Sequence, residues 1–89
     1  MSVLILLCET LGTFLLVLAV LASGNWLVIG LTLAAILWLV GDISGGHVNP
    51  AITLVMYMNG SFTGVLALQY VLAQVVGGLS ALYTYRMLM

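Results

Sequence analysis

Residues 41–50 read GDISGGHVNP and interrupt a chain of 89 residues that is otherwise almost uniformly apolar. Glycines and a proline break helical structure and polar side chains crowd this stretch, so it cannot continue a transmembrane helix. Asn49 is a strong helix N-cap and Pro50 suits the first helical position, so the pair predicts that a new helix begins here. The apolar run that follows, residues 51–58, would span only about 12 Å as a helix. It can therefore reach the middle of a bilayer and no further.

Three longer apolar runs surround this interruption. Residues 3–22 are long enough to span a hydrocarbon core of about 30 Å, and Glu9 inside them, with no Lys or Arg before, favours a retained helix over a signal peptide. A shorter run continues through residues 26–43, and residues 62–87 end in an aromatic and basic interface belt. The sequence thus predicts an all-α transmembrane fold with three membrane-spanning helices, plus one re-entrant loop and half-helix at about residues 44–58.

Composition limits the classes of function. Hydrophobic residues make up 65% of the chain and charged residues 3%, which leaves too little polar surface to coat a soluble globule. We therefore expect an integral, multi-pass membrane protein whose surroundings are the lipid bilayer. The absence of a basic patch excludes nucleic acid as a partner. The single Cys8 excludes an internal disulfide and a Cys-based zinc site. No nucleophile–base pair or metal cluster can be assembled, so neither an enzyme nor a cofactor is expected.

The interruption itself carries the functional prediction. Irregular backbone at membrane depth is tolerated only where it is buried in protein or lines a water-filled cavity, so residues 44–49 should border a pore or pocket. Asn49 would offer an amide donor at the positive end of the half-helix dipole. The carbonyls of Gly45, Gly46 and His47 would offer acceptors in a row. Together these groups favour neutral hydrogen-bonding solutes and oppose protons and cations.

At this point the sequence resembles a known family. Residues 44–53 read SGGHVNPAIT, which is similar to the first Asn-Pro-Ala loop of the aquaporins, the major intrinsic protein family. Glu9 within ETLGTF resembles the first helix of the family, and Gln74 within AQVVG resembles its third. The resemblance covers essentially the whole chain, and it implies that residues 1–89 form a single half-aquaporin unit equivalent to the amino-terminal half.

The resemblance also implies roles for individual residues. The positions that would line the pore or its mouth are Gly45, Gly46, His47, Asn49, Pro50 and Ala51. Glu9 and Gln74 would brace the loop by hydrogen bonds to its backbone, which accounts for a carboxyl group that costs about 2.5–3.5 kcal/mol to insert into a bilayer. Ile29, twenty residues before Asn49, matches the second-helix position of the family's narrow filter. That position is often aromatic in the family, so Ile29 departs from the pattern.

Members of the aquaporin family contain two inverted halves, each with one half-helix. The resemblance implies that this chain corresponds to one of these halves. Two copies inserted in opposite orientations would recreate the inverted repeat and bring two Asn49 tips together. Arg86 is the only Lys or Arg, and after three spans it lies on the side opposite the amino terminus, so charge bias permits both orientations. The sequence thus predicts a passive channel for water or small neutral solutes. A complementary half supplied by a second chain, a non-conducting half that modulates a full-length aquaporin, and a product without a transport role remain open.

Overall fold

A computed structural model of the chain describes residues 2–89 and is all-α over this range, which confirms the all-α part of the predicted fold. The helices are α1 (Ser2–Ser23), α2 (Trp26–Val40), α3 (Pro50–Met58) and α4 (Gly64–Leu88). Two helical stretches, Val3–Ser23 and Gly64–Leu88, are long and apolar enough to cross a bilayer, whereas α2 is a shorter apolar helix of 15 residues.

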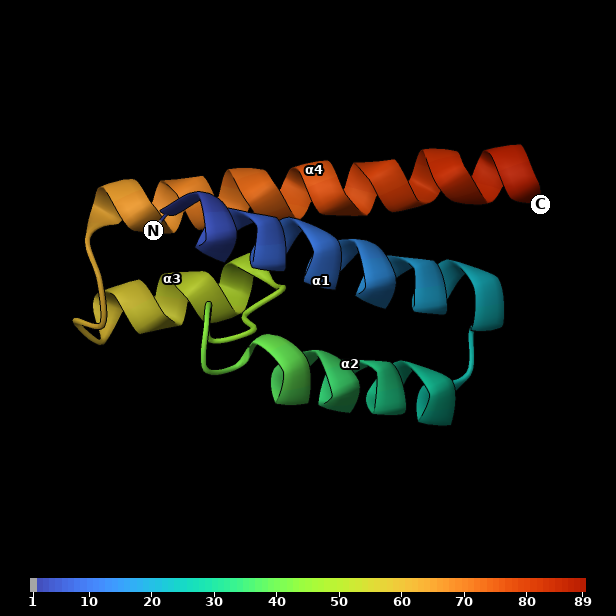
Figure 1. Cartoon of the computed structure of the whole chain (residues 1–89), viewed down its shortest axis with the longest axis horizontal. Helices are drawn as coiled ribbons and strands as arrows, with labels where there is room; N and C mark the ends of the chain where they lie inside the picture. The colour runs from blue at the N-terminus through green and yellow to red at the C-terminus, as the bar shows by residue number, and fades with distance from the viewer. Residues whose placement is uncertain (1) are drawn as a thin grey trace.

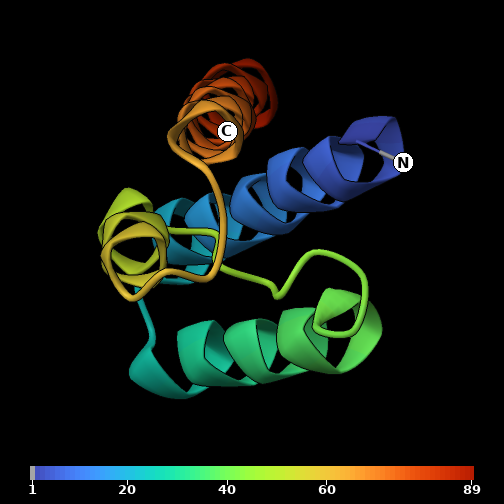
Figure 2. The same ribbon diagram turned by 90° about the vertical axis from the view of Figure 1, so that its left-hand side faces the viewer.

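The helices pack around α1. Figure 1 shows α1 and α4 side by side along the long axis of the molecule, running in the same direction, and this pair makes the most extensive contact. The chain returns along α1 as α2, and α3 follows at the end of the molecule where α4 begins and contacts α4. In both Figure 1 and Figure 2, α1 lies between α4 and α2. The irregular segment that joins α2 to α3 therefore runs close to α1.

Asn49 is the N-cap of α3, as the sequence predicts. Its backbone is extended, with φ −158° and ψ 124°, and its side chain accepts a hydrogen bond from the Ala51 N–H at 2.8 Å. Pro50 is the first residue of α3, where its missing N–H leaves no donor unpaired. The predicted N-cap is confirmed.

The start of α4 differs from the predicted start at residue 62. The helix begins at Gly64, because Thr63 is extended and its hydroxyl accepts a hydrogen bond from the Leu66 N–H at 3.2 Å, as an N-cap does. Phe62 consequently lies in the connection between α3 and α4, outside the helix. At the end of α2, regular helix stops at Val40, but turns extend the chain as far as Ser44.

The interior of the molecule is polar. Glu9 and Thr53 are completely buried and Gln74 is 2% exposed, whereas large apolar side chains cover the outside, including Trp26 and Trp38 at more than 80% exposure. A soluble protein of this size would show the reverse distribution. This arrangement suits a surface in contact with lipid and an interior built around a hydrogen-bonded loop.

Candidate functional site

Glu9 is the centre of the hydrogen bonds that hold the loop between α2 and α3. Its Oε2 accepts from the Ser44 hydroxyl at 2.8 Å and from the His47 N–H at 3.1 Å. Its Oε1 accepts from the Val48 N–H at 2.9 Å and from the Gln74 amide at 3.1 Å. The side chain is completely buried, so protein donors replace water at both carboxylate oxygens. A carboxyl group on α1 thereby ties the loop to the helices.

Gln74 reaches the loop indirectly. We predicted hydrogen bonds from this residue to the loop backbone, but its Nε2 donates to Glu9 and to the Thr53 hydroxyl, the latter at 2.8 Å. The N–H groups of His47 and Val48 are bound to Glu9. Gln74 therefore bonds to side chains and not to the loop backbone. Thr53 also lies 2.9 Å from His47 Nδ1. The brace on the loop is therefore a network of side chains from α1, α3 and α4.

The loop backbone adopts an unusual conformation. Gly45 and Gly46 have φ values of 89° and 59°, which glycine tolerates, but Val48 also has a positive φ of 45°. Positive φ in a β-branched residue is an outlier that costs about 1–3 kcal/mol and needs support from its surroundings. Val48 is 4% exposed, is bonded to Glu9 and packs on α1 at Gly12, where an added Cβ would lie 2.7 Å from its Cγ1. Tertiary contacts hold this strained conformation.

The conformation separates donors from acceptors along the loop. The N–H of Gly46 binds the Ser44 hydroxyl at 3.1 Å, and the next two N–H groups bind Glu9. Within residues 2–89, no hydrogen bond reaches the carbonyl oxygens of Gly45, Gly46, His47 or Val48. Backbone acceptors rarely stay unpaired, so these carbonyls need water or a solute as their partner. The loop thus has its donors turned toward the protein and a row of four acceptors without protein partners.

Asn49 adds a donor next to these acceptors. Its side chain is exposed, and its Oδ1 is occupied by the Ala51 N–H. Across the described part of the chain, no hydrogen bond involves its Nδ2, which stays available to an oxygen atom from outside. Pro50 and Ala51 are exposed beside it in the first turn of α3, where the helix dipole is positive.

The imidazole of His47 points into the protein, where it meets two aromatic residues, Phe62 and Tyr70, that no sequence motif indicated. His47 as a residue is 8% exposed, and its ring stacks on Phe62 with centroids 5.4 Å apart and lies 4.9 Å from the Tyr70 ring. The Tyr70 hydroxyl donates to the Ser44 carbonyl at 2.7 Å. The one sequence signal for Tyr70 is its spacing. It lies four residues before Gln74 on α4, and residues four apart share a helical face.

Replacing Tyr70 with Phe tests this contact. We expect a loss of about 1 kcal/mol of folding stability, because the buried Ser44 carbonyl loses its donor while the stacked rings stay in place. Unfolding in detergent micelles, followed by circular dichroism, measures the change. Tyr83→Phe is the matched control, since Tyr83 is 58% exposed. Equal stability of both variants would contradict a role for the hydroxyl in holding the loop.

Ile29 lies apart from this cluster. It occupies the first turn of α2, whereas the loop follows the last turn of the same helix (Figure 1). The structure therefore brings together the other predicted residues, on the loop, α1, α4 and the first turn of α3, and leaves Ile29 at the far end of α2. In residues 2–89, no group of three or more His, Cys, Asp or Glu side chains could hold a metal ion.

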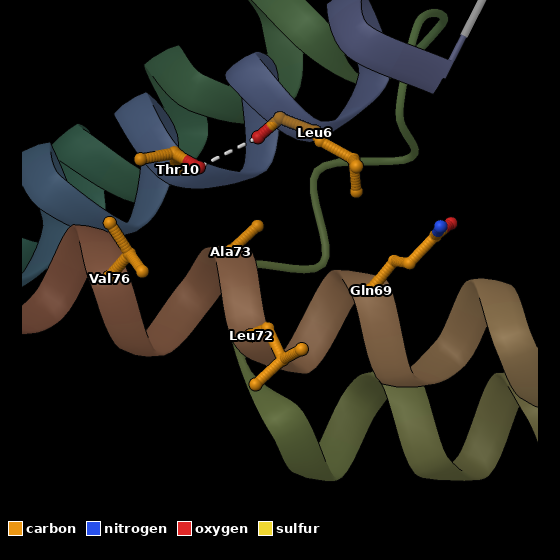
Figure 3. A pocket seen from close by; sticks show the side chains of 6 residues that line it. All are labelled: Leu6, Thr10, Gln69, Leu72, Ala73 and Val76. Atoms are coloured by element: carbon orange, nitrogen blue, oxygen red, sulfur yellow. Dashed lines mark hydrogen bonds between the residues drawn. The ribbon is translucent and has the colours of Figure 1, made fainter.

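A separate open groove of about 260 Å³ lies between α1 and α4 (Figure 3). Its lining is Leu6, Thr10, Gln69, Leu72, Ala73 and Val76. Two polar side chains line the groove, Thr10 and Gln69. The Thr10 hydroxyl donates to the Leu6 carbonyl at 2.8 Å, and the Gln69 amide takes no part in this bond. The groove shares no residue with the loop network.

Comparison with known proteins identifies the family. A sequence model of the major intrinsic protein family matches residues 23–89, well over half of the chain. The chain therefore belongs to the major intrinsic protein family, which confirms the resemblance seen in the sequence, and its apolar helices are those of a membrane protein.

Curated relatives agree with this assignment. The chain is 37% identical to Aquaporin Z of Photorhabdus laumondii over 85% of its own length. It is 39% identical to Glycerol uptake facilitator protein-like 6 of Lactiplantibacillus plantarum over 84% of its length, and 35% identical to Nodulin-26 of Glycine max over 93%. The matches cover 39%, 39% and 36% of these relatives, so the chain spans about two fifths of their length.

Proposed function

We propose that the chain is a single half-aquaporin unit over residues 1–89, with α1, α2 and α4 as three membrane spans and residues 44–58 as a re-entrant segment. The turns at Gly41–Ser44 lengthen α2 toward the thickness of a bilayer core, which supports its assignment as a span. The nine residues of α3 are too few to cross a bilayer, which supports a half-helix that ends at mid-depth.

The proposed function is passive permeation of water or small neutral solutes through a pore that two such halves build in inverted orientation. One observation carries the proposal: the loop N–H groups bind Glu9 and Ser44, whereas four loop carbonyls and the Asn49 Nδ2 group have no protein partner within residues 2–89. Acceptors in a row beside a donor, at the positive end of a helix dipole, replace the hydration of a neutral solute and disfavour cations. The names of the relatives, aquaporin and glycerol uptake facilitator, are consistent with solutes of this class.

The surface of α3 supports the pairing of two halves. Of its nine residues only Thr53 is buried, and its exposed large apolar side chains are Ile52, Leu54, Val55, Tyr57 and Met58. An inverted second half would cover part of this surface and place a second Asn49 opposite the first. A second copy of the chain is the simplest source of that half, and a complementary chain is the other. In this proposal Ile29 narrows the pore at the far end of α2.

The expected result for Asn49→Asp is loss of permeation with the fold retained. An Asp carboxylate can still accept from the Ala51 N–H and cap α3, but it replaces the amide donor with a negative charge. Stopped-flow osmotic shrinkage of liposomes that contain the purified chain measures water permeation, and circular dichroism measures the fold. Exposed Asn59→Asp, at the other end of α3, is the matched control that we expect to conduct normally. A conducting Asn49→Asp protein would remove Asn49 from the pore.

The same liposomes separate the alternative functions. Shrinkage faster than that of protein-free liposomes, with this chain as the only protein, means that copies of the chain build the pore. Folded protein without shrinkage excludes a pore made of copies alone. Co-reconstitution with a full-length aquaporin then distinguishes a silent partner from a half that binds and modulates another channel.

A further inference from the structure

The hydrogen bonds around Gln74 define which way its amide faces. Gln74 presents one terminal atom to Glu9 Oε1, which already accepts from the Val48 N–H and serves as an acceptor. An amide oxygen in that position would face another oxygen acceptor, so the atom must be the nitrogen. The two hydrogens of Nε2 are then both used, one on Glu9 at 3.1 Å and one on Thr53 Oγ1 at 2.8 Å.

The Thr53 hydroxyl accepts a hydrogen bond from Gln74 and must donate its own hydrogen to another acceptor. Its side chain is completely buried, so water does not serve as the acceptor. Within residues 2–89 the Thr53 hydroxyl makes hydrogen-bond contacts with Gln74 Nε2 and His47 Nδ1; none reaches the Asn49 carbonyl, which accepts from the Thr53 N–H at 3.1 Å, or Gln74 Oε1, which has no partner. His47 Nδ1, at 2.9 Å, is the acceptor that remains.

We propose that Thr53 is a positioning residue of the pore loop, whose hydroxyl holds His47 in the neutral tautomer that carries its hydrogen on Nε2. An imidazole that accepts at Nδ1 donates at Nε2. The Nε2 edge lies against Gly45, since a Cβ added to Gly45 would lie 3.2 Å from both Cδ2 and Nε2. Phe62 and Tyr70 pack against the imidazole ring and hold its plane.

The consequence for the loop is a defined donor beside its acceptors. Gly45 is exposed, and its carbonyl is the first of the four without a protein partner. An Nε2–H group of His47 that is fixed next to Gly45 places a positive partial charge near the first of the four unpartnered carbonyls. The effect on permeation rests on the proposed function, whereas the tautomer is a property of the folded chain alone.

The chain is well suited to the test because His47 is its only histidine. Labelling with 15N-histidine gives two imidazole resonances, and their positions in lipid-reconstituted protein report the tautomer directly. We expect the wild-type protein to show a single species with Nε2 protonated and Nδ1 accepting. Thr53→Val, which keeps the shape and removes the hydroxyl, should lose this preference and give a mixture of tautomers with slower permeation. Thr53→Ser should restore the single species and the permeation.

Thr32→Val is the matched control, because the Thr32 hydroxyl donates within α2 to the Val28 carbonyl at 2.7 Å. It should leave the His47 resonances unchanged. A wild-type ring protonated on Nδ1, or a Thr53→Val protein that keeps the pure Nε2–H form, overturns the proposal. Should Thr53→Val fail to fold, the wild-type and Thr53→Ser spectra still decide it. A protein with the expected tautomer that does not conduct would exclude a pore made of copies of this chain alone and leave this inference standing.

Discussion

Replacing Glu9 with Gln should lower the free energy of unfolding by about 2–6 kcal/mol. Glu9 accepts hydrogen bonds from four donors, and a Gln side chain in the same place offers one oxygen and turns an NH₂ group against the other donors. At least two buried donors then lose their acceptor, at about 1–3 kcal/mol each. The strained φ of Val48 loses support at the same time. The expected loss is a large share of the 5–15 kcal/mol that usually separates folded from unfolded protein.

Unfolding in detergent micelles measures this loss, and amide hydrogen exchange of His47 and Val48 locates it. Both amides should be protected in the wild-type protein and should exchange much faster in the variant, because they bind Glu9 directly. Asp42→Asn removes the other acidic side chain, which is exposed, and should change neither quantity. Protected loop amides in the Gln variant would show that Glu9 does not hold the loop.

Replacing Gly77 with Ala should cost about 1–3 kcal/mol, as overpacking of a tight contact does. A Cβ at Gly77 would collide with the backbone carbonyl of Thr10 and would lie 3.1 Å from the Phe14 nitrogen. These are backbone atoms of α1, so the clash is relieved only if α1 and α4 move apart. Gln74 lies one turn earlier on α4, and its hydrogen bond to Glu9 would lengthen with that movement.

Gly78→Ala is the matched control because it changes the neighbouring residue in the same way. The atoms nearest to a Cβ at Gly78 belong to the side chains of Val17 and Thr13, at 3.6 Å and 3.9 Å. Alanine is favoured over glycine inside a helix by about 1 kcal/mol, so this variant should be neutral or more stable. Micelle unfolding of the pair gives the comparison. Equal stabilities would mean that the approach of α1 to α4 at Gly77 is not tight.

Properties that depend on neighbours along the chain could be predicted from the sequence. The long apolar runs located α1 and α4, because length and hydropathy decide whether a helix can cross a bilayer. The Asn49-Pro50 pair located the start of α3, because an N-cap acts on N–H groups two or three residues away. The start of α4 was placed two residues early, because any of several neighbouring polar residues could cap it and Thr63 does so.

The contacts of the loop depend on residues that are distant in the chain. Glu9 bonds to Val48 across 39 positions and to Gln74 across 65, and no local pattern specifies which donors a buried carboxyl will meet. The positive φ of Val48 is unfavourable locally and persists because Glu9 and α1 support it. Sequence therefore identified the polar residues that interrupt the apolar runs. Packing of α1 against α4 assigned their partners, because a buried donor or acceptor takes whichever complementary group the fold brings within reach.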